Sequence, residues 1–217
     1  MIDLHTHSIF SDGELIPSEL ARRAKVAGCR ALAITDHADH SNFDFIIPRL
    51  AKVCRKLTDA FGIKVIPGIE LTHVPPEYIY ELAIEARRAG AMIIVVHGET
   101  IVEPVVRGTN MAALKATIDV LAHPGLITKE EAMEAAKNSI YLEITARKGH
   151  SLTNGHVAKM ARQAKAALIL NSDSHSPDDL VNRDMAGRIA LGAGLAETES
   201  AAMFRNSETL VRKALEK

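Results

Sequence analysis

Seven short apolar runs, each followed by a helix-like stretch, constrain the fold of this 217-residue chain more than any other feature. The runs are rich in β-branched residues and almost continuously apolar, as expected for parallel strands that helices cover. The predicted strands are 1–5, 31–35, 64–71, 91–97, 118–123, 140–145 and 167–172.

The stretches between these runs carry apolar residues at three- and four-residue spacing, which is typical of amphipathic helices. Pro17 suits the first turn of the first helix, and Gly28 suits its end. A final helix at about 206–216 follows the last strand unit, and we expect it to pack on the outside. The other predicted helices are 17–28, 46–61, 77–89, 111–117, 129–138, 154–166 and 178–191.

The alternation of strands and helices predicts an α/β fold, with residues 1–217 forming a single domain. Seven units without a linker rich in Pro, Gly or Ser fit one closed or nearly closed TIM-like (β/α)7 barrel. A doubly wound open sheet remains the competing architecture.

Composition excludes several partners. The net charge of −1 gives no bulk attraction to nucleic acid or to a membrane surface. No apolar run approaches the roughly 18 residues that span a bilayer. The N-terminal sequence "MIDLHTH" lacks the basic and apolar regions of a signal peptide, so we expect a cytoplasmic protein. Cys29 and Cys54 have no CxxC partner and are expected to be reduced thiols in or near the core.

Histidine is the unusual component, with ten copies in a chain that has no tryptophan. Polar side chains follow the end of every predicted strand, and in β/α barrels the carboxyl ends of the strands form the active site. Imidazole and carboxylate are ligands for zinc, iron and manganese, so this placement predicts a site for several metal ions. The residues are His5, His7 and Asp12; Asp36 and His37; Glu70 and His73; His97 and Glu99; His123; Glu143, Arg147, Lys148 and His150; and Asp173 and His175.

The first of these positions is an HxH pair. Because side chains alternate along a strand, His5 and His7 point to the same side and can bind one ion. An isolated HxH pair is weak evidence, but histidines and carboxylates at six later strand ends make it specific.

The motifs "DLHTHSIFSDG", "AITDHAD", "PGIEL", "VVHGE", "LAHPG" and "NSDSH", spread over residues 3–175, resemble the PHP (polymerase and histidinol phosphatase) family of metal-dependent phosphoesterases. The resemblance implies a distorted seven-stranded β/α barrel that holds two or three divalent ions, either zinc, manganese or iron. It also implies three ligand groups. The first ion would bind His5, His7, Glu70 and Asp173; the second Glu70, His97 and His123; and the third Asp12, His37 and His175.

One ligand departs from the pattern, because some family members carry histidine at the position of Asp12. An oxygen ligand at this position would weaken the third site or change its metal.

Clustered dications lower the pKa of a bound water and neutralise the charge on a phosphate, so no protein nucleophile is needed. The expected activity is hydrolysis of a small phosphate monoester, histidinol-phosphate-like or nucleotide-like. Asp36 is a candidate proton donor to the leaving group.

Phosphate also requires cationic side chains. Arg147 is the first candidate for binding and for charge neutralisation during catalysis, with Lys148 beside it. Arg107 and Arg183 are further candidates. His150 either contacts substrate or supports its loop.

The remaining histidines divide into two groups. His73 is a ligand, a partner of a ligand or a substrate contact. His40 and His156 are expected to be surface or helix-end residues.

Three other functions compete with this one. A phosphodiesterase or 3′–5′ exonuclease is disfavoured because the chain lacks a basic strip with interspersed aromatic residues. An amidohydrolase often places a modified lysine where this chain has His97. A structural or regulatory metal-binding module would not require a complete ligand set.

Overall fold

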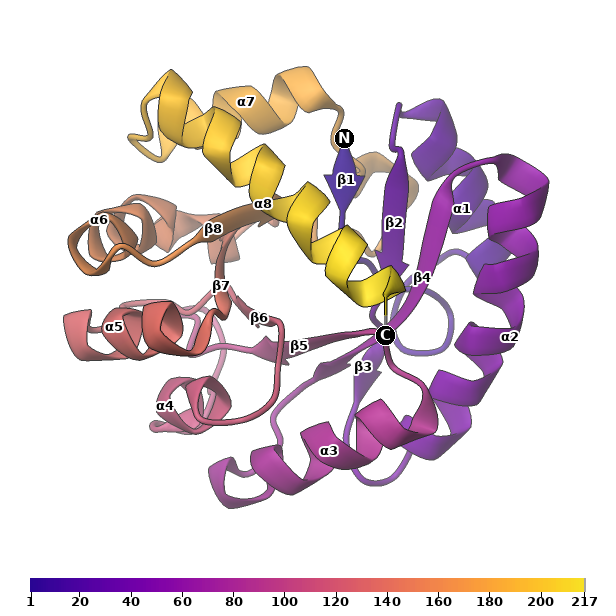
Figure 1. The fold of residues 1–217 in the computed structure, drawn as a ribbon, viewed down its shortest axis with the longest axis horizontal. Coiled ribbons are helices and arrows are strands. Elements are labelled where there is room, and N and C mark those ends of the chain that lie inside the picture. The colour runs from indigo at the N-terminus through magenta and orange to yellow at the C-terminus, as the bar shows by residue number, and fades with distance from the viewer. Residues whose placement is uncertain (217) are drawn as a thin grey trace.

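The computed structural model describes residues 1–216 and confirms the α/β barrel (Figure 1). All strand pairs are parallel, and the sheet follows the chain in the order β1-β2-β4-β5-β6-β7-β8. A doubly wound sheet would reverse this order at a switch point, so that alternative is excluded. The strands are β1 (Ile2–Asp3), β2 (Ala31–Ile34), β3 (His37–Ala38), β4 (Lys64–Leu71), β5 (Ile93–His97), β6 (Val120–Ala122), β7 (Tyr141–Thr145) and β8 (Leu168–Asn171).

The sheet closes almost completely between its first and last strands. Beyond the ends of β1 and β8, Thr6 and Ser174 form an isolated parallel bridge, and the His7 amide donates to the Ser174 carbonyl at 2.8 Å. This closure brings His7, near the start of the chain, beside Asp173, which follows the last strand.

The second predicted strand is divided into two parts. β2 pairs with the first half of β4, and after Thr35 and Asp36 the short β3 pairs with the second half, with His37 opposite Glu70. The interruption therefore places an imidazole directly beside a buried carboxylate.

Helices surround the sheet, and a large apolar core fills the space between the helices and the strands. The predicted helix 129–138 forms with the same bounds, and the other predicted helices form with shifted ends. For example, the expected helix 178–191 becomes a short 3-10 turn, η3 (Pro177–Asp179), followed by α7. The other helices are α1 (Pro17–Val26), α2 (Phe43–Phe61), α3 (Ile79–Ala89), α4 (Thr109–Leu114), α5 (Lys129–Asn138), α6 (Asn154–Ala164), α7 (Arg183–Gly192) and α8 (Glu197–Leu215), with 3-10 turns η1 (Pro76–Tyr78) and η2 (His150–Thr153).

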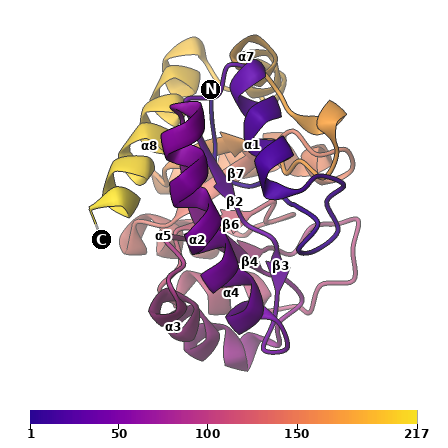
Figure 2. The same ribbon diagram turned by 90° about the vertical axis from the view of Figure 1, so that its right-hand side faces the viewer.

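The C-terminal helix α8 starts nine residues before the predicted position 206, and it covers the amino-terminal end of the barrel. Leu210, Val211 and Ala214 belong to the same apolar cluster as Ile2 and Leu4 near the start of the barrel. Figure 2 shows α8 at one end of the molecule and the loop between β1 and α1 at the other.

The interior of the barrel therefore changes character along its axis. In β5 the inward positions run Ile93, Val95, His97, and in β4 Ile66 is followed at the same parity by Glu70. Among residues 1–216, no helix is both long enough and apolar enough to cross a membrane.

Candidate metal centre

The carboxyl end of the barrel gathers all nine predicted ligands around one cavity of about 270 Å³ or in the buried layer beneath it. They come from β3, β4, β5 and the segments that follow β1, β6 and β8. The residues that line the cavity are Asp12, His37, Thr72, His97, Glu103, His123, Arg147, His150, Asp173 and His175.

Glu70 occupies the centre of the buried layer. One of its oxygens, Oε1, lies 3.2 Å from His5 Nε2 and 3.7 Å from His123 Nε2. The other, Oε2, lies 2.5 Å from His37 Nδ1 and 3.7 Å from His7 Nε2. A carboxylate with imidazoles on both oxygens has the arrangement of a bridging ligand.

Asp173 faces the same layer from the segment after β8. Its Oδ1 lies 3.2 Å from His7 Nε2 and 3.6 Å from His5 Nε2, and its Oδ2 lies 3.7 Å from His123 Nε2. Burial raises the pKa of this carboxyl to about 7. A cation close to this carboxyl would favour its negatively charged form.

A second cluster lies nearer the solvent and consists of Asp12, His37 and His175. The three pairwise distances between Asp12 Oδ1 and the two Nε2 atoms are 3.3 to 3.4 Å. Tetrahedral zinc with bonds of about 2.0–2.1 Å separates its ligand atoms by about 3.3 Å. The triangle therefore has the dimensions of a tetrahedral ion site.

The wall opposite this triangle contains His97, His123 and His150, whose ligand atoms also lie close enough together to share an ion. The His123 and His150 rings stack with centroids 4.2 Å apart. Thr100 Oγ1 lies 2.8 Å from His150 Nδ1 and fixes that ring, so its Nε2 faces the cavity. His150 thus contributes to the imidazole cluster, although its sequence position suggested substrate contact or loop support.

Five buried polar atoms of this layer have no hydrogen-bond partner among the described residues, namely His5 Nε2, His7 Nδ1, His7 Nε2, Glu70 Oε1 and His123 Nδ1. An unsatisfied buried polar atom costs about 1–3 kcal/mol, and native proteins contain few of them. Four of the five belong to imidazole nitrogens and the fifth to a carboxylate, the donor types that bind zinc and manganese. The residues present therefore fit a metal cluster.

The protonation of the imidazoles is uneven. Burial lowers the pKa of His7 and of His123 well below the usual value, which keeps both rings neutral, as metal ligands must be. Burial also opposes protonation of His37, but Glu70 and Asp12 outweigh it and raise the pKa of His37 to about 9.

Glu143 in β7 orients the cluster from below. Its Oε1 lies 2.9 Å from His5 Nδ1, and its Oε2 accepts the backbone N–H of His123 at 3.2 Å. Fixing Nδ1 of His5 in this way points Nε2 toward Glu70 and Asp173.

The backbone is also unusual at this end of the barrel. His73, His123 and Asp173 adopt positive φ angles of 53°, 27° and 54°. Ser139 and Lys165 share this conformation, but each of them ends a helix. Left-handed non-glycine residues carry strain that tends to collect at functional sites.

The structure places Asp36, the candidate proton donor, away from the cavity. Its carboxylate accepts hydrogen bonds from the backbone N–H groups and hydroxyls of Ser8 and Ser11, at 2.7 to 3.1 Å. Three of these bonds are to Oδ1 and one is to Oδ2, and Asp36 does not line the cavity. Asp36 therefore holds the loop that carries Asp12.

Of the predicted phosphate-binding cations, only Arg147 reaches the cavity. Its Nη1 donates to Asp179 Oδ2 at 3.0 Å. Arg107 lines a separate pocket beside Glu99, Lys148 is exposed outside the cavity, and the Arg183 guanidinium lies 4.2 Å above the Phe204 ring. These three placements share one reason, because loops that start at the active face can still turn their side chains away from it.

Three residues of the site were missed in the sequence. Glu103 Oε2 lies 3.1 Å from His97 Nε2, and this hydrogen bond lowers the pKa of Glu103 to about 2. Asp179 fixes Arg147 and accepts the backbone N–H of His175 at 3.0 Å. Thr72 Oγ1 contacts His37 Nδ1 at 2.7 Å. Glu103 and Asp179 lie several residues beyond a strand end. Of the three, only Thr72 directly follows a strand, which is the position at which the sequence predicts site residues.

Two predictions about residues away from the site agree with the structure. His156 bonds to the Ile127 carbonyl from α6, and His40 lies against Tyr78, so neither lines the cavity. Cys29 and Cys54 are buried free thiols, and burial raises the pKa of each to about 12.

Comparisons with known proteins agree with this geometry. The family model described as the PHP domain matches residues 3–169. An uncharacterized protein of Methanocaldococcus jannaschii is 49% identical over 199 residues, which cover 91% of each chain. A probable phosphatase of Shewanella pealeana is 28% identical over 204 residues, covering 81% of this chain and 77% of the relative.

The fold is also similar to a solved structure, the histidinol phosphate phosphatase of Lactococcus lactis in complex with zinc, L-histidinol and phosphate. The TM-score is 0.66 at 16% sequence identity, and the match covers 90% of this chain and 94% of that one.

Proposed function

This chain belongs to the PHP domain family, and we propose that it is a phosphatase that hydrolyses small phosphate monoesters. At the coarser level it is a metal-dependent phosphoesterase. The proposal concerns the substrate class and the residues that act on it.

The size and lining of the cavity carry the proposal. A volume of about 270 Å³ lies just below the usual range of about 300–1,000 Å³ for ligand pockets. Such a space suits a phosphate with a small leaving group. It does not suit the several nucleotides that a nucleic-acid channel must hold.

The nine sequence-predicted ligands are the residues that would hold two or three divalent ions. When bound, such ions activate a water molecule and neutralise charge on the phosphate. The ligand set favours zinc, manganese or iron, since imidazole nitrogens and carboxylate oxygens are both present.

Arg147 would bind the phosphate. Its Nη1 is held by Asp179, which fixes the guanidinium at the cavity wall and leaves further N–H groups for the ligand. Asp179 also accepts from the backbone N–H of His175 and Ser176. The same carboxylate therefore positions a phosphate-binding arginine and a predicted metal ligand.

The test is hydrolysis of p-nitrophenyl phosphate in the presence of manganese, zinc or cobalt. We expect turnover that a chelator abolishes and that His7→Ala lowers at least about a hundredfold. Removal of a metal ligand should reduce activity more than removal of a residue that only orients a ligand. His156→Ala removes an imidazole outside the cavity and serves as the matched control. Activity that survives both the chelator and His7→Ala would contradict the proposal.

The substrate class is tested in parallel with bis-p-nitrophenyl phosphate and single-stranded DNA. Hydrolysis of these diesters without hydrolysis of the monoester would favour the phosphodiesterase alternative. A panel of histidinol phosphate and nucleoside monophosphates then separates the two monoester classes.

A further inference from the structure

The loop between β5 and α4 places the carboxylate of Glu103, which is not one of the nine predicted ligands, against three imidazoles. Glu103 Oε2 lies 3.1 Å from His97 Nε2 and 3.4 Å from His73 Nε2. Glu103 Oε1 lies 3.4 Å from His150 Nε2. The carboxylate thus faces imidazoles with both of its oxygens.

This group repeats the construction of the triangle formed by Asp12, His37 and His175. Each contains two imidazole Nε2 atoms and one partly exposed carboxylate, with contacts of 3.1 to 3.4 Å. The ligand atoms of His73, His97 and Glu103 lie close enough together to share one ion. Two imidazoles and a glutamate also make the His₂Glu set that holds catalytic zinc with one position open.

The orientation of His97 supports this arrangement. Its Nδ1 contacts the Gly98 carbonyl at 3.2 Å, so Nε2 is the atom that faces the cavity. Among the described residues, Glu103 is the carboxylate within 4.0 Å of that nitrogen, whereas Glu70 pairs with His5, His7, His37 and His123.

The backbone conformation of His73 also supports this arrangement. This residue has a φ of 53°, although it is a histidine outside any helix end. The left-handed conformation turns its ring toward His97, with centroids 5.2 Å apart. Asparagine tolerates this conformation better than most residues, which makes a clean substitution available.

We propose that Glu103 and His73 are further ligands of the divalent ion that His97 binds, at the mouth of the cavity. The inference rests on the proposed function in one respect, since it takes His97 to be a metal-facing residue. It adds a ligand carried by the loop 98–108, so that the position of this loop depends on bound metal.

The experiment measures zinc binding directly, by metal analysis after equilibrium dialysis and by competition with a chromophoric chelator. The full-length protein is compared with Glu103→Gln, His73→Asn and the double variant. Glu77→Gln removes an equal charge from an exposed residue with no contact to the imidazoles and is the matched control.

We expect Glu103→Gln and His73→Asn each to weaken one class of zinc ion at least tenfold, or to remove it. The double variant should lose no more than either single variant, because both side chains would hold the same ion. Glu77→Gln should bind zinc as the unmodified protein does.

The melting temperature with and without zinc separates a ligand from a simple ion pair. A ligand role predicts that zinc raises the melting temperature less in Glu103→Gln than in the unmodified protein. If Glu103 only pairs with protonated imidazoles, Glu103→Gln in the presence of a chelator will melt at a lower temperature than the unmodified protein, and its zinc binding will be unchanged. That result would overturn the inference.

The two proposals fail in different ways. Unchanged zinc binding in Glu103→Gln and His73→Asn, with activity lost in His7→Ala, leaves the proposed function standing and removes the two added ligands. Absence of zinc binding in the unmodified protein would remove both.

Discussion

The two ends of the barrel are built from the same strands but hold opposite kinds of side chain. At the amino-terminal end, Ile2, Ile66 and Ile93 belong to the same buried apolar cluster as Leu210 of α8. At the carboxyl-terminal end, the same strands or the residues just beyond them place His5, Glu70 and His97 in the interior. One end satisfies its side chains by apolar contact, and the other leaves four buried imidazole nitrogens and one carboxylate oxygen without a hydrogen-bond partner among residues 1–216.

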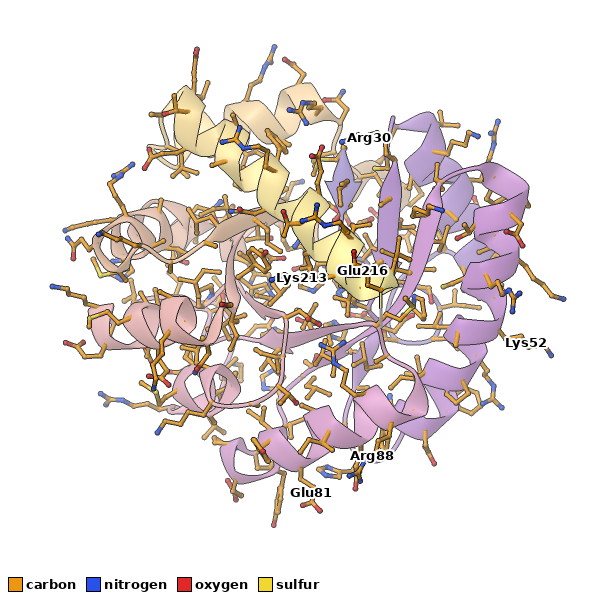
Figure 3. The ribbon with its side chains drawn as sticks, in the orientation of Figure 1. Arg30, Lys52, Glu81, Arg88, Lys213 and Glu216 are labelled. Atoms are coloured by element: carbon orange, nitrogen blue, oxygen red, sulfur yellow. The ribbon has the colours of Figure 1, made fainter. Side chains whose placement is uncertain are left out.

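The charged side chains near α8 also differ from those at the opposite end of the barrel. In Figure 3 the labelled Arg30, Lys213 and Glu216 lie around α8, while Lys52 and Arg88 belong to the surrounding helices. Arg30 pairs with Glu208 of α8 at 2.5 Å, so charges at this end are exposed and paired across the surface. The difference teaches that stability and chemistry are separated along the barrel axis.

The largest expected effect tests this separation at the amino-terminal end. Leu210→Ala should lower the free energy of unfolding by about 2–5 kcal/mol, because it opens a cavity in a buried apolar cluster. Urea unfolding in the presence of a chelator measures this decrease in the free energy of unfolding. Leu215→Ala, at a half-exposed position near the end of the same helix, should change stability far less.

The separation between the two ends would be contradicted if Leu210→Ala also changed the zinc affinity of the folded protein. That result would mean that the packing of α8 is transmitted through the strands to the metal ligands.

The next effect tests the carboxyl-terminal end. Arg147→Ala should lower kcat/KM for a phosphate monoester by about 10²–10³-fold, or about 2.7–4 kcal/mol, as for removal of a donor to a developing negative charge. Lys148→Ala removes the neighbouring cation, which lies outside the cavity, and should leave the rate nearly unchanged. Equal losses in both variants would show that net charge, not the placement of Arg147, governs binding.

The smallest effect locates the boundary between the two ends. Asp3 in β1 accepts hydrogen bonds from Ser172 after β8, and burial raises its pKa to about 6. Because the pKa is higher in the folded state than in the unfolded chain, protonation of Asp3 stabilises the fold. This contribution is fully present below about pH 4 and is lost as the pH rises through about 6, for a total of up to about 3 kcal/mol.

Asp3→Asn keeps the shape of the side chain and removes the titration. The stability of the variant relative to the unmodified protein should therefore rise by up to about 3 kcal/mol between pH 4 and pH 7. Urea unfolding at the two pH values measures the change. If the stability difference between Asp3→Asn and the unmodified protein does not vary with pH, burial does not raise the pKa of Asp3.

The sequence was sufficient to predict the barrel because its signal is local. Apolar β-branched runs, helical spacing and a polar residue at each strand end can all be recognised within short windows. The nine predicted ligands converge because the carboxyl ends of parallel strands in a barrel must meet. Their roles as ligands stay a prediction that metal analysis will decide.

The residues that the sequence misplaced lie in loops. Arg107 and Lys148 follow strands on the active face, yet their side chains turn away from the cavity. Glu103 lies six residues beyond His97, and nothing in its neighbours marks it as a site residue. Loop conformation depends on contacts with distant segments, which no local pattern records.

The sequence by itself thus determined the architecture, the face that carries the chemistry and the kinds of ligand on it, because strand periodicity fixes which side chains point inward. Only the tertiary structure decided which partners they meet. It turned Asp36 toward Ser8 and Ser11, brought Asp179 to Arg147, and placed Glu103 against His97. Each of these contacts joins residues whose separation depends on how loops pack, which the free energy of the whole fold determines.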